Sequence, residues 1–150
     1  EWEPLWDLSD CNRTSYMRQL KMQKIKSAND QGYSFLCFDI EDNTLLGGIN
    51  ISNVQRGIIQ TANIGYWLGE KHTKKGYMIE SLEIISPFLF DQMKLNRIQA
   101  FTLPENSSSR NLLVRLKFEE EGLIRNCMKI NDVWRDHLLY SKLAKEYSTL

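Results

Sequence analysis

The sequence predicts a single α/β domain with a mixed sheet, and three observations lead to that fold class. The chain has 150 residues, which is the size of one domain. The spacing of apolar residues changes along the chain from alternation to steps of three and four, so strands and helices follow one another. One helical stretch lies between two strands, which predicts a right-handed crossover that joins two parallel strands.

The first part of the chain is predicted to form one helix and then an antiparallel meander. The helix spans Ser15–Gln31, with Leu20 and Ala28 among its apolar positions. Ser15 or Thr14 can cap it, because a side-chain oxygen accepts a hydrogen bond from the first turn. Three runs rich in aromatic and β-branched residues follow, separated by turn signals, and we expect them to be strands: Tyr33–Ile40, Thr44–Val54 and Ile58–Leu68.

The second part begins with a helix that has one buried stripe. Its apolar residues fall at steps of three and four: Met78, Leu82, Ile85, Leu89 and Met93. Pro87 lies inside this helix and predicts a kink, because proline lacks the N–H group that bonds to the preceding turn. The remaining expected elements are a strand, a short helix and a closing hairpin of two strands: Arg97–Leu103, Ser107–Leu116, Glu120–Ile130 and Val133–Leu143.

The composition excludes several classes of protein. The chain has 19 Lys and Arg residues and 19 Asp and Glu residues, so its formal net charge of zero argues against a nucleic-acid binder. No apolar run reaches the roughly 18 residues that span a bilayer, and no signal peptide opens the sequence. Three cysteines without a CxxC pair fit the reducing cytoplasm. The two histidines, His72 and His137, cannot build a zinc cluster, so we expect no metal.

The connection between the third strand and the long helix, Gly69–Met78, is the segment best suited to bind a ligand. Gly76 stands where the loop turns into the helix, and glycine permits a positive φ and a close approach of the backbone to a ligand. The N–H groups of a helix N-terminus bind anions, and Lys74 and Lys75 add positive charge. Thr73–Met78 is therefore predicted to bind a phosphate or pyrophosphate, although a single glycine before a helix also fits a plain connection.

Four blocks in chain order carry a family resemblance. Thr73–Met78 keeps the central glycine of a Q/R-x-x-G-x-G/A motif, and Pro104–Leu113 contains PEN-x-x-S. Leu116–Gly122 is close to LGFxxEG, with Lys117 in place of the glycine, and Ile130–His137 completes the set. Together they resemble the GNAT acyltransferase superfamily, in particular the ribosomal-protein-alanine N-acetyltransferases of the RimJ/RimL type, and the last block is closer to RimJ.

The resemblance implies a GNAT fold: a mostly antiparallel mixed sheet with helices on both faces and a V-shaped splay between the strands Ile58–Leu68 and Arg97–Leu103. In that fold the pantetheine arm of acetyl-CoA enters the gap, and its pyrophosphate lies on the N–H groups of the following helix. The implied cofactor-binding residues are Tyr66, Trp67, Leu68, Thr73, Lys74, Lys75, Gly76, Tyr77, Met78, Asn106 and Ser109. Asn106 and Ser109 are also the implied catalytic residues, bonding to the pantetheine or the departing sulfur, although both equally suit a helix start.

The same resemblance implies an acetyl-CoA-dependent N-acetyltransferase in the cytoplasm. Its acceptor would be the α-amine of an N-terminal alanine on a small-subunit ribosomal protein. One alternative is the same fold acetylating a small amine. The other is a non-catalytic CoA-binding module that docks on a ribosome or partner protein through the basic helix residues in Arg18–Lys26, although such a pattern is more often a solvated helix face. We expect no membrane and no direct nucleic-acid partner, and both a monomer and a homodimer remain open.

The sequence does not identify a general base. The position that matches the glutamate implicated in RimL-type enzymes is Met128. Glu80, Glu121 and Asp136 remain as candidates, while Asp136 and His137 also suit the acceptor pocket or simple strand pairing.

Residues 1–150 are expected to be one GNAT domain without the strand and first helix that usually precede the helix at Ser15–Gln31. The sequence begins with glutamate rather than methionine, so we expect an N-terminally shortened domain. The zero net charge is then a property of this piece.

Overall fold

The computed structural model describes residues 7, 9 and 11–147 of the chain. Its helices and strands, in chain order, are α1 (Arg13–Ala28), β1 (Tyr33–Phe38), β2 (Leu45–Gln55), β3 (Thr61–Leu68), the 3-10 helix η1 (Glu70–His72), α2 (Tyr77–Pro87), the π-helix η2 (Phe88–Gln92), β4 (Arg97–Thr102), α3 (Ser107–Arg115), β5 (Glu119–Ile130), β6 (Val133–Leu143) and α4 (Ala144–Tyr147). Apart from the short helices η1, η2 and α4, this is the order that the sequence predicts.

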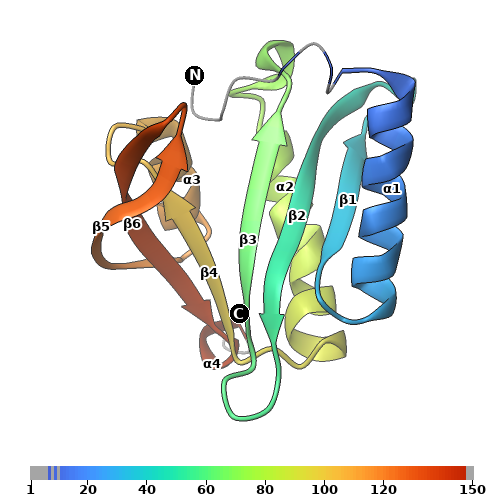
Figure 1. The fold of residues 1–150 in the computed structure, drawn as a ribbon. Coiled ribbons are helices and arrows are strands. Elements are labelled where there is room, and N and C mark those ends of the chain that lie inside the picture. Colours follow the sequence, from blue (N-terminus) through green and yellow to red (C-terminus); the bar gives the residue numbers. More distant parts are fainter. Residues whose placement is uncertain (1–6, 8, 10, 148–150) are drawn as a thin grey trace.

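All six strands form one mixed sheet in the order β1-β2-β3-β4-β6-β5. Neighbouring strands run antiparallel, except β3 and β4, which are parallel. Helix α2 connects this parallel pair and lies behind β2 and β3, while α1 lies beside β1 (Figure 1). The meander, the crossover and the closing hairpin confirm the predicted fold class.

The parallel pair β3–β4 is short, and its two strands then separate. They pair at three successive positions, from Thr61 with Arg97 to Asn63 with Gln99. Beyond Asn63, β3 continues beside β2, whereas β4 continues beside β6, so β3 and β4 diverge from each other (Figure 1). The sheet therefore contains the predicted V-shaped splay. We call this V the fork, its paired side the closed end, and the side of residues 64–68 the open end.

The hydrophobic core lies between the sheet and the long helix α2. The predicted apolar stripe is buried at all five positions: Met78, Leu82, Ile85, Leu89 and Met93. These side chains share one cluster with buried residues of the central strands, among them Ile51, Ile64 and Ile98. Burying one such side chain contributes about 1.5–3 kcal/mol, so this stripe determines which face of α2 meets the sheet.

Pro87 changes the hydrogen-bond pattern of the long helix. The α-helix ends at Pro87 and continues as η2, in which the Met93 N–H donates to the Phe88 carbonyl at 2.9 Å. Proline lacks a donor and crowds the preceding turn, and the change of helix type follows directly after it. The Phe88 ring then contacts Tyr33 and Phe35 of β1, with centroid distances of 5.3 and 5.5 Å. The helix therefore changes type at the position where the sequence predicts a kink.

The predicted boundaries of the first helix are wrong. Helix α1 spans Arg13–Ala28 rather than Ser15–Gln31. Its cap is Asn12, whose side-chain oxygen accepts from the Ser15 N–H at 2.9 Å, so the cap lies before both residues proposed for it. The helix ends before Asp30, because that residue has a φ of 55°, outside the right-handed helical region.

The predicted start of β3 is also wrong, because Ile58 and Ile59 lie in the hairpin turn rather than in the strand. Two β-branched apolar residues in a row favour a strand, yet the Ile58 side chain is fully exposed. Gly57 and Gln60 flank this pair with φ values of 71° and 48°, which reverse the chain between β2 and β3. The strand therefore begins at Thr61.

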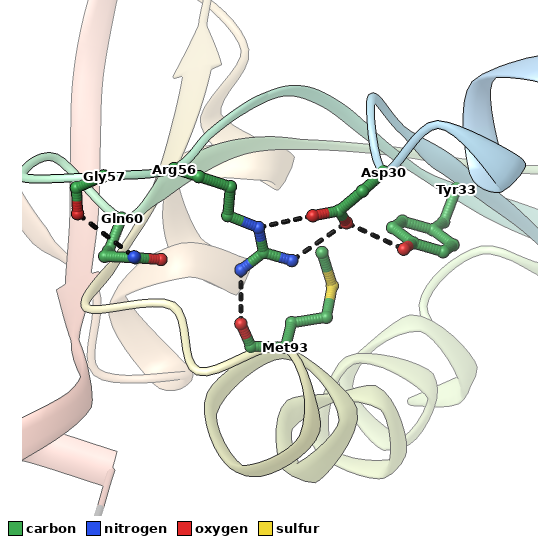
Figure 2. Close-up of polar contacts among 6 residues, drawn as sticks. All are labelled: Asp30, Tyr33, Arg56, Gly57, Gln60 and Met93. Carbon is green, nitrogen blue, oxygen red and sulfur yellow. Dashed lines mark hydrogen bonds and ion pairs between the residues drawn. The ribbon is translucent and has the colours of Figure 1, made fainter.

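A cluster of polar side chains joins three segments at the closed end of the fork. The Arg56 guanidinium binds both carboxylate oxygens of Asp30 and the carbonyl of Met93 (Figure 2). The Tyr33 hydroxyl donates to the same carboxylate at 2.8 Å. The hydrogen bond from Arg56 holds the pKa of Asp30 below its ordinary value. This Arg56 cluster joins the end of α1, the β2–β3 turn and the end of η2.

Candidate active site

The connection from β3 to α2 has the geometry of an anion site at the open end. Gly76 is the N-cap of α2 and has a φ of 90°, a left-handed conformation that favours glycine. A Cβ on Gly76 would meet nothing within 4 Å, so the backbone angle rather than space requires glycine here. In the described part of the chain no side chain caps α2, which leaves the N–H groups of its first turn for a ligand.

The residues around Gly76 offer backbone groups and charge. Lys74 and Lys75 are exposed, whereas the Met78 side chain is buried in the core, so its backbone is the part within reach of a ligand. The Thr73 hydroxyl donates to the Glu70 carbonyl at 2.9 Å and closes η1. Tyr77 is half-buried at the start of α2, next to the ring of His72.

The open end of β3 provides a strand edge for an extended ligand. Tyr66, Trp67 and Leu68 pair with β2, beyond the point where β3 leaves β4. Tyr66 and Leu68 pack against the core, while Trp67 lies on the opposite face and is 44% exposed. The Trp67 indole covers Gly48 so closely that a Cβ there would lie 2.9 Å from its Nε1. The edge directed toward β4 is available for backbone hydrogen bonds.

Helix α3 begins on the other side of the fork. Asn106 is its N-cap, and the amide oxygen accepts from the Ser109 N–H at 3.0 Å. The capping role that the sequence left open for Asn106 is therefore present in the structure. Ser109 stands at the third position of the helix and is half-buried.

One hydrogen bond joins the two sides of the fork at the open end. The Tyr66 hydroxyl and the Ser109 Oγ are 2.8 Å apart. Burial raises the pKa of Tyr66 to about 12, so its phenol is protonated at neutral pH. Sequence reasoning missed this contact, because it assigned a role only to the Tyr66 backbone. The available signal was a tyrosine in an apolar strand, since a buried phenol needs a hydrogen-bond partner.

Some buried side-chain oxygens on the two described strands of the fork have no hydrogen-bond partner. Among the described residues, three such side-chain oxygens lack a hydrogen-bond partner: Thr61 Oγ1, Asn63 Oδ1 and Thr102 Oγ1. Asn63 is the last residue of β3 that pairs with β4, and Thr102 is the last residue of β4. A buried polar atom without a partner is costly. Thr102 lies beyond the paired positions, so its oxygen suits an amide of a pantetheine arm in the fork, and the N–H groups at the start of α2 suit a pyrophosphate.

Two of the three carboxylates considered as general bases form hydrogen bonds with other residues of the sheet. Glu121 is bound by Arg97, accepts from Ser141 at 2.7 Å and has a pKa of about 2, chiefly because of the hydrogen bond from Arg97. Such a carboxylate is a weak base, and it lies toward the closed end, where Arg97 pairs with β3. Asp136 accepts a backbone N–H of β5 at 2.8 Å. Glu80 is exposed in the first turn of α2.

The β5–β6 hairpin carries the remaining residues that the sequence singled out. His137 is buried, with Nδ1 3.2 Å from the Arg135 carbonyl oxygen. Met128 pairs across the hairpin with Arg135 and is 40% exposed. The Arg135 side chain binds Glu105, which lies just before α3, so the hairpin and the start of α3 are joined.

A cavity of about 430 Å³ adjoins the fork on its core side. Its lining includes Ile64 of β3, Ser86 of α2, Arg115 of α3 and the buried Lys142. The Lys142 Nζ donates to the Leu116 carbonyl at 2.9 Å, and burial lowers the pKa of this lysine. None of the cofactor-binding residues predicted from the sequence lines this cavity. A lysine within the apolar strand β6 was the sequence feature that could have indicated the cavity.

Three further properties concern the part of the chain that the structure describes. None of its helices is long and apolar enough to cross a bilayer. It holds no group of three or more His, Cys, Asp or Glu side chains placed to bind a metal ion. The three cysteines, Cys11, Cys37 and Cys127, are free thiols.

Sequence comparisons agree with this geometry. The chain matches the family described as an acetyltransferase (GNAT) domain over residues 2–119. It is 39% identical over 108 residues to the probable N-acetyltransferase YjcK of Bacillus subtilis, a match that covers 72% of this chain and 60% of the relative. It is 36% identical over 149 residues to the ribosomal protein uS5-alanine N-acetyltransferase of Escherichia coli, covering 98% of this chain and 76% of the relative.

Solved structures give the same picture. The ribosomal-protein-S5-alanine acetyltransferase of Vibrio fischeri superposes with a TM-score of 0.90 at 25% identity, covering 97% of this chain and 80% of that one. The RimJ protein of Mycobacterium smegmatis, solved in complex with CoA-disulfide, superposes with a TM-score of 0.88 at 30% identity, covering 97% and 70%. These matches confirm the resemblance that the four sequence blocks predicted.

Proposed function

The chain belongs to the GNAT acetyltransferase family, and we propose that it transfers the acetyl group of acetyl-CoA to the α-amine of an N-terminal alanine on a ribosomal protein. The observation that carries this proposal is the 36% identity to the E. coli uS5-alanine enzyme over 98% of the chain. The fork supports it, because the start of α2 and the open edge of β3 suit the two polar parts of acetyl-CoA.

The residues of the chain bind and orient the two reactants. Acetyl-CoA supplies an acetyl group that is activated as a thioester. The N–H groups at the start of α2, together with Lys74 and Lys75, attract its pyrophosphate. The backbone of residues 66–68 holds the pantetheine arm as an added strand at the edge of β3. Asn106 fixes the first turn of α3, which carries Ser109 to the open end.

The chemistry needs little acid or base strength. A free α-amine has a pKa of roughly 8 and a thiol one near 8.5, so part of the amine is neutral at pH 7 and the thiolate is a good leaving group. Orientation of the amine and the thioester then supplies most of the rate. This agrees with the structure, in which Glu121 and Asp136 are held in hydrogen bonds within the sheet.

Calorimetric titration with acetyl-CoA tests the first half of the proposal. We expect saturable binding well below about 1 mM, and no heat of binding at that concentration would contradict it. Mass spectrometry after incubation with an alanine-starting peptide of a ribosomal protein tests the second half. We expect one added acetyl group on the free peptide and none on the same peptide with a blocked amine. Acetylation of spermidine but of no alanine peptide would contradict the proposed acceptor.

We also propose that the reaction takes place in the cytoplasm. The three free thiols support this location, because unpaired cysteines are typical of reducing compartments. Cell fractionation with the protein followed by an antibody should recover it with cytoplasmic markers, and recovery in a membrane fraction would contradict the proposal.

A further inference from the structure

The hydrogen bond between Tyr66 and Ser109 has two possible directions. The two hydroxyl oxygens are 2.8 Å apart, and either can be the donor. Each hydroxyl has one proton to donate and lone pairs to accept with. When the phenol donates, the serine proton is left for another acceptor. When the serine donates, the phenol proton needs a second acceptor within a buried environment.

The surroundings of the two side chains favour the phenol as donor. Tyr66 packs against the core between the sheet and α2, and Ser109 is the hydrogen-bond partner that the structure gives its hydroxyl. The pKa of about 12 keeps the proton on this phenol. Ser109 is half-buried in the first turn of α3, beside the open end that we assign to the ligand.

We propose that Tyr66 is a positioning residue for acetyl transfer, which holds the Ser109 hydroxyl as an acceptor so that the serine proton is directed at the sulfur of CoA. This inference rests on the proposed function. As the acceptor nitrogen bonds to the acetyl carbon, the bond from that carbon to sulfur breaks and sulfur takes its electron pair. The nitrogen loses a proton to water. Ser109 donates a hydrogen bond to the thiolate and keeps its own proton, and water then protonates the sulfur.

A purely structural role is the alternative, in which the hydrogen bond only ties α3 to β3. Four variants separate the two roles: Tyr66→Phe, Ser109→Ala, the double variant, and Tyr33→Phe as a matched control. Tyr33 also donates a tyrosine hydrogen bond of 2.8 Å, to Asp30, but it does so at the closed end. Each tyrosine variant removes one hydroxyl and keeps the ring.

The first readout is the pKa of the CoA thiol in the complex, followed by the ultraviolet absorbance of the thiolate during a pH titration. In the wild-type complex we expect this pKa to lie about one unit below the ordinary value of about 8.5. Tyr66→Phe, Ser109→Ala and the double variant should all raise it to the same value. Tyr33→Phe should leave it unchanged. This readout needs CoA binding but no acceptor.

The second readout is the kinetics of acetyl transfer. Tyr66→Phe should lower kcat about tenfold and change the KM for acetyl-CoA less than about twofold, because it removes orientation rather than binding. Ser109→Ala should lower kcat by at least as much, the double variant should match Ser109→Ala, and Ser109→Thr should retain most of the activity.

Two results would overturn the inference. In the first, Tyr66→Phe leaves the thiol pKa and kcat at their wild-type values while Ser109→Ala changes them, which assigns the tyrosine a structural role only. In the second, the effects of the two variants multiply, so Tyr66 acts independently of Ser109. Failure of the proposed function gives a different result. Wild-type protein that binds CoA but acetylates no alanine peptide contradicts only the proposed acceptor, and the thiol titration then still tests the role of Tyr66. Wild-type protein that does not bind CoA contradicts both.

Discussion

The closed and open ends of the fork are built in opposite ways. At the closed end, charged hydrogen bonds join distant segments: Arg56 binds Asp30 and the Met93 carbonyl, and Arg97 binds Glu121. At the open end, β3 has left β4, and one hydrogen bond between neutral hydroxyls reaches from β3 to α3. The two ends therefore have different roles in the binding site that we propose. Firm pairing on one side keeps the strands in register, while their separation on the other exposes backbone groups to a ligand.

The largest expected effect is at Gly76, on the side of the fork that we assign to the ligand. Valine at Gly76 is strained at a φ of 90°, and relief of that strain moves the N–H groups that we propose bind the pyrophosphate. Gly76→Val should weaken acetyl-CoA binding about a hundredfold, or about 2.7 kcal/mol, in a calorimetric titration. The matched control is Gly57→Val. Gly57 also has a positive φ, 71°, and open space around it, but it lies by the closed end, so its variant should bind normally. Equal weakening in both would contradict the assignment.

The second effect concerns alkaline pH and the open end. Burial raises the pKa of Tyr66 from 10.0 to about 12. Its contribution to stability is therefore complete below pH 10 and is lost as the pH rises from about 10 to about 12, because the unfolded chain loses the proton first. The free energy of unfolding of the wild type should fall by about 2 kcal/mol more than that of Tyr66→Phe over this range. Urea unfolding of both proteins measures it, and parallel curves would contradict a buried phenol.

The third effect removes the Arg56 cluster from the closed end. Arg56→Ala leaves the Asp30 carboxylate and the Met93 carbonyl without their shared donor, and should lower the free energy of unfolding by about 1.5 kcal/mol. The partial exposure of Arg56 and Asp30 keeps this value small. Thermal or urea unfolding checks it against Arg125→Ala, which alters an exposed arginine of β5. Acetyl-CoA affinity should be unchanged in both variants, and a loss confined to Arg56→Ala would show that the two ends are coupled.

The smallest effect is the acid dependence of the Arg97–Glu121 pair. The pKa of Glu121 is lowered from 4.5 to about 2, so its contribution is present above pH 4.5 and is lost as the pH falls from about 4.5 to about 2. Glu121 is 37% exposed, and solvent screening reduces the contribution to about 1 kcal/mol. Glu121→Gln should flatten the stability profile in this range. The exposed Glu119→Gln should not, and the reverse result would contradict the account of the closed end.

Local patterns in the sequence predicted the turn at Gly76, the buried face of the long helix and the parallel pair of strands. Gly76 could be assigned because a turn from strand to helix has few solutions and glycine fits the left-handed one. The stripe from Met78 to Met93 fixed the buried face of the long helix, and its place between two strands gave the parallel pair. Each of these is a property of neighbouring residues.

Local sequence patterns could not predict side-chain contacts between residues that are far apart in the sequence. Arg56 meets Asp30 across 26 positions and the Met93 carbonyl across 37, and Tyr66 meets Ser109 across 43. Neither Arg56 nor Tyr66 has a neighbour in sequence that marks its partner. Ile58 shows the opposite error: its type favours a strand, but the turn around it exposes it fully. The sequence therefore predicted elements and their order, while long-range pairing set the boundaries and the side-chain contacts.

The most direct test of the two ends of the fork is hydrogen exchange of the backbone amides, measured with and without CoA. We expect CoA to slow exchange at the open end, in residues 64–68 of β3 and 77–79 of α2. We expect no change around Asp30, Arg56 and Met93, because the hydrogen bonds of the Arg56 cluster already hold the closed end together. Protection centred on the closed end, or no protection at the open end in a saturated complex, would contradict these expectations.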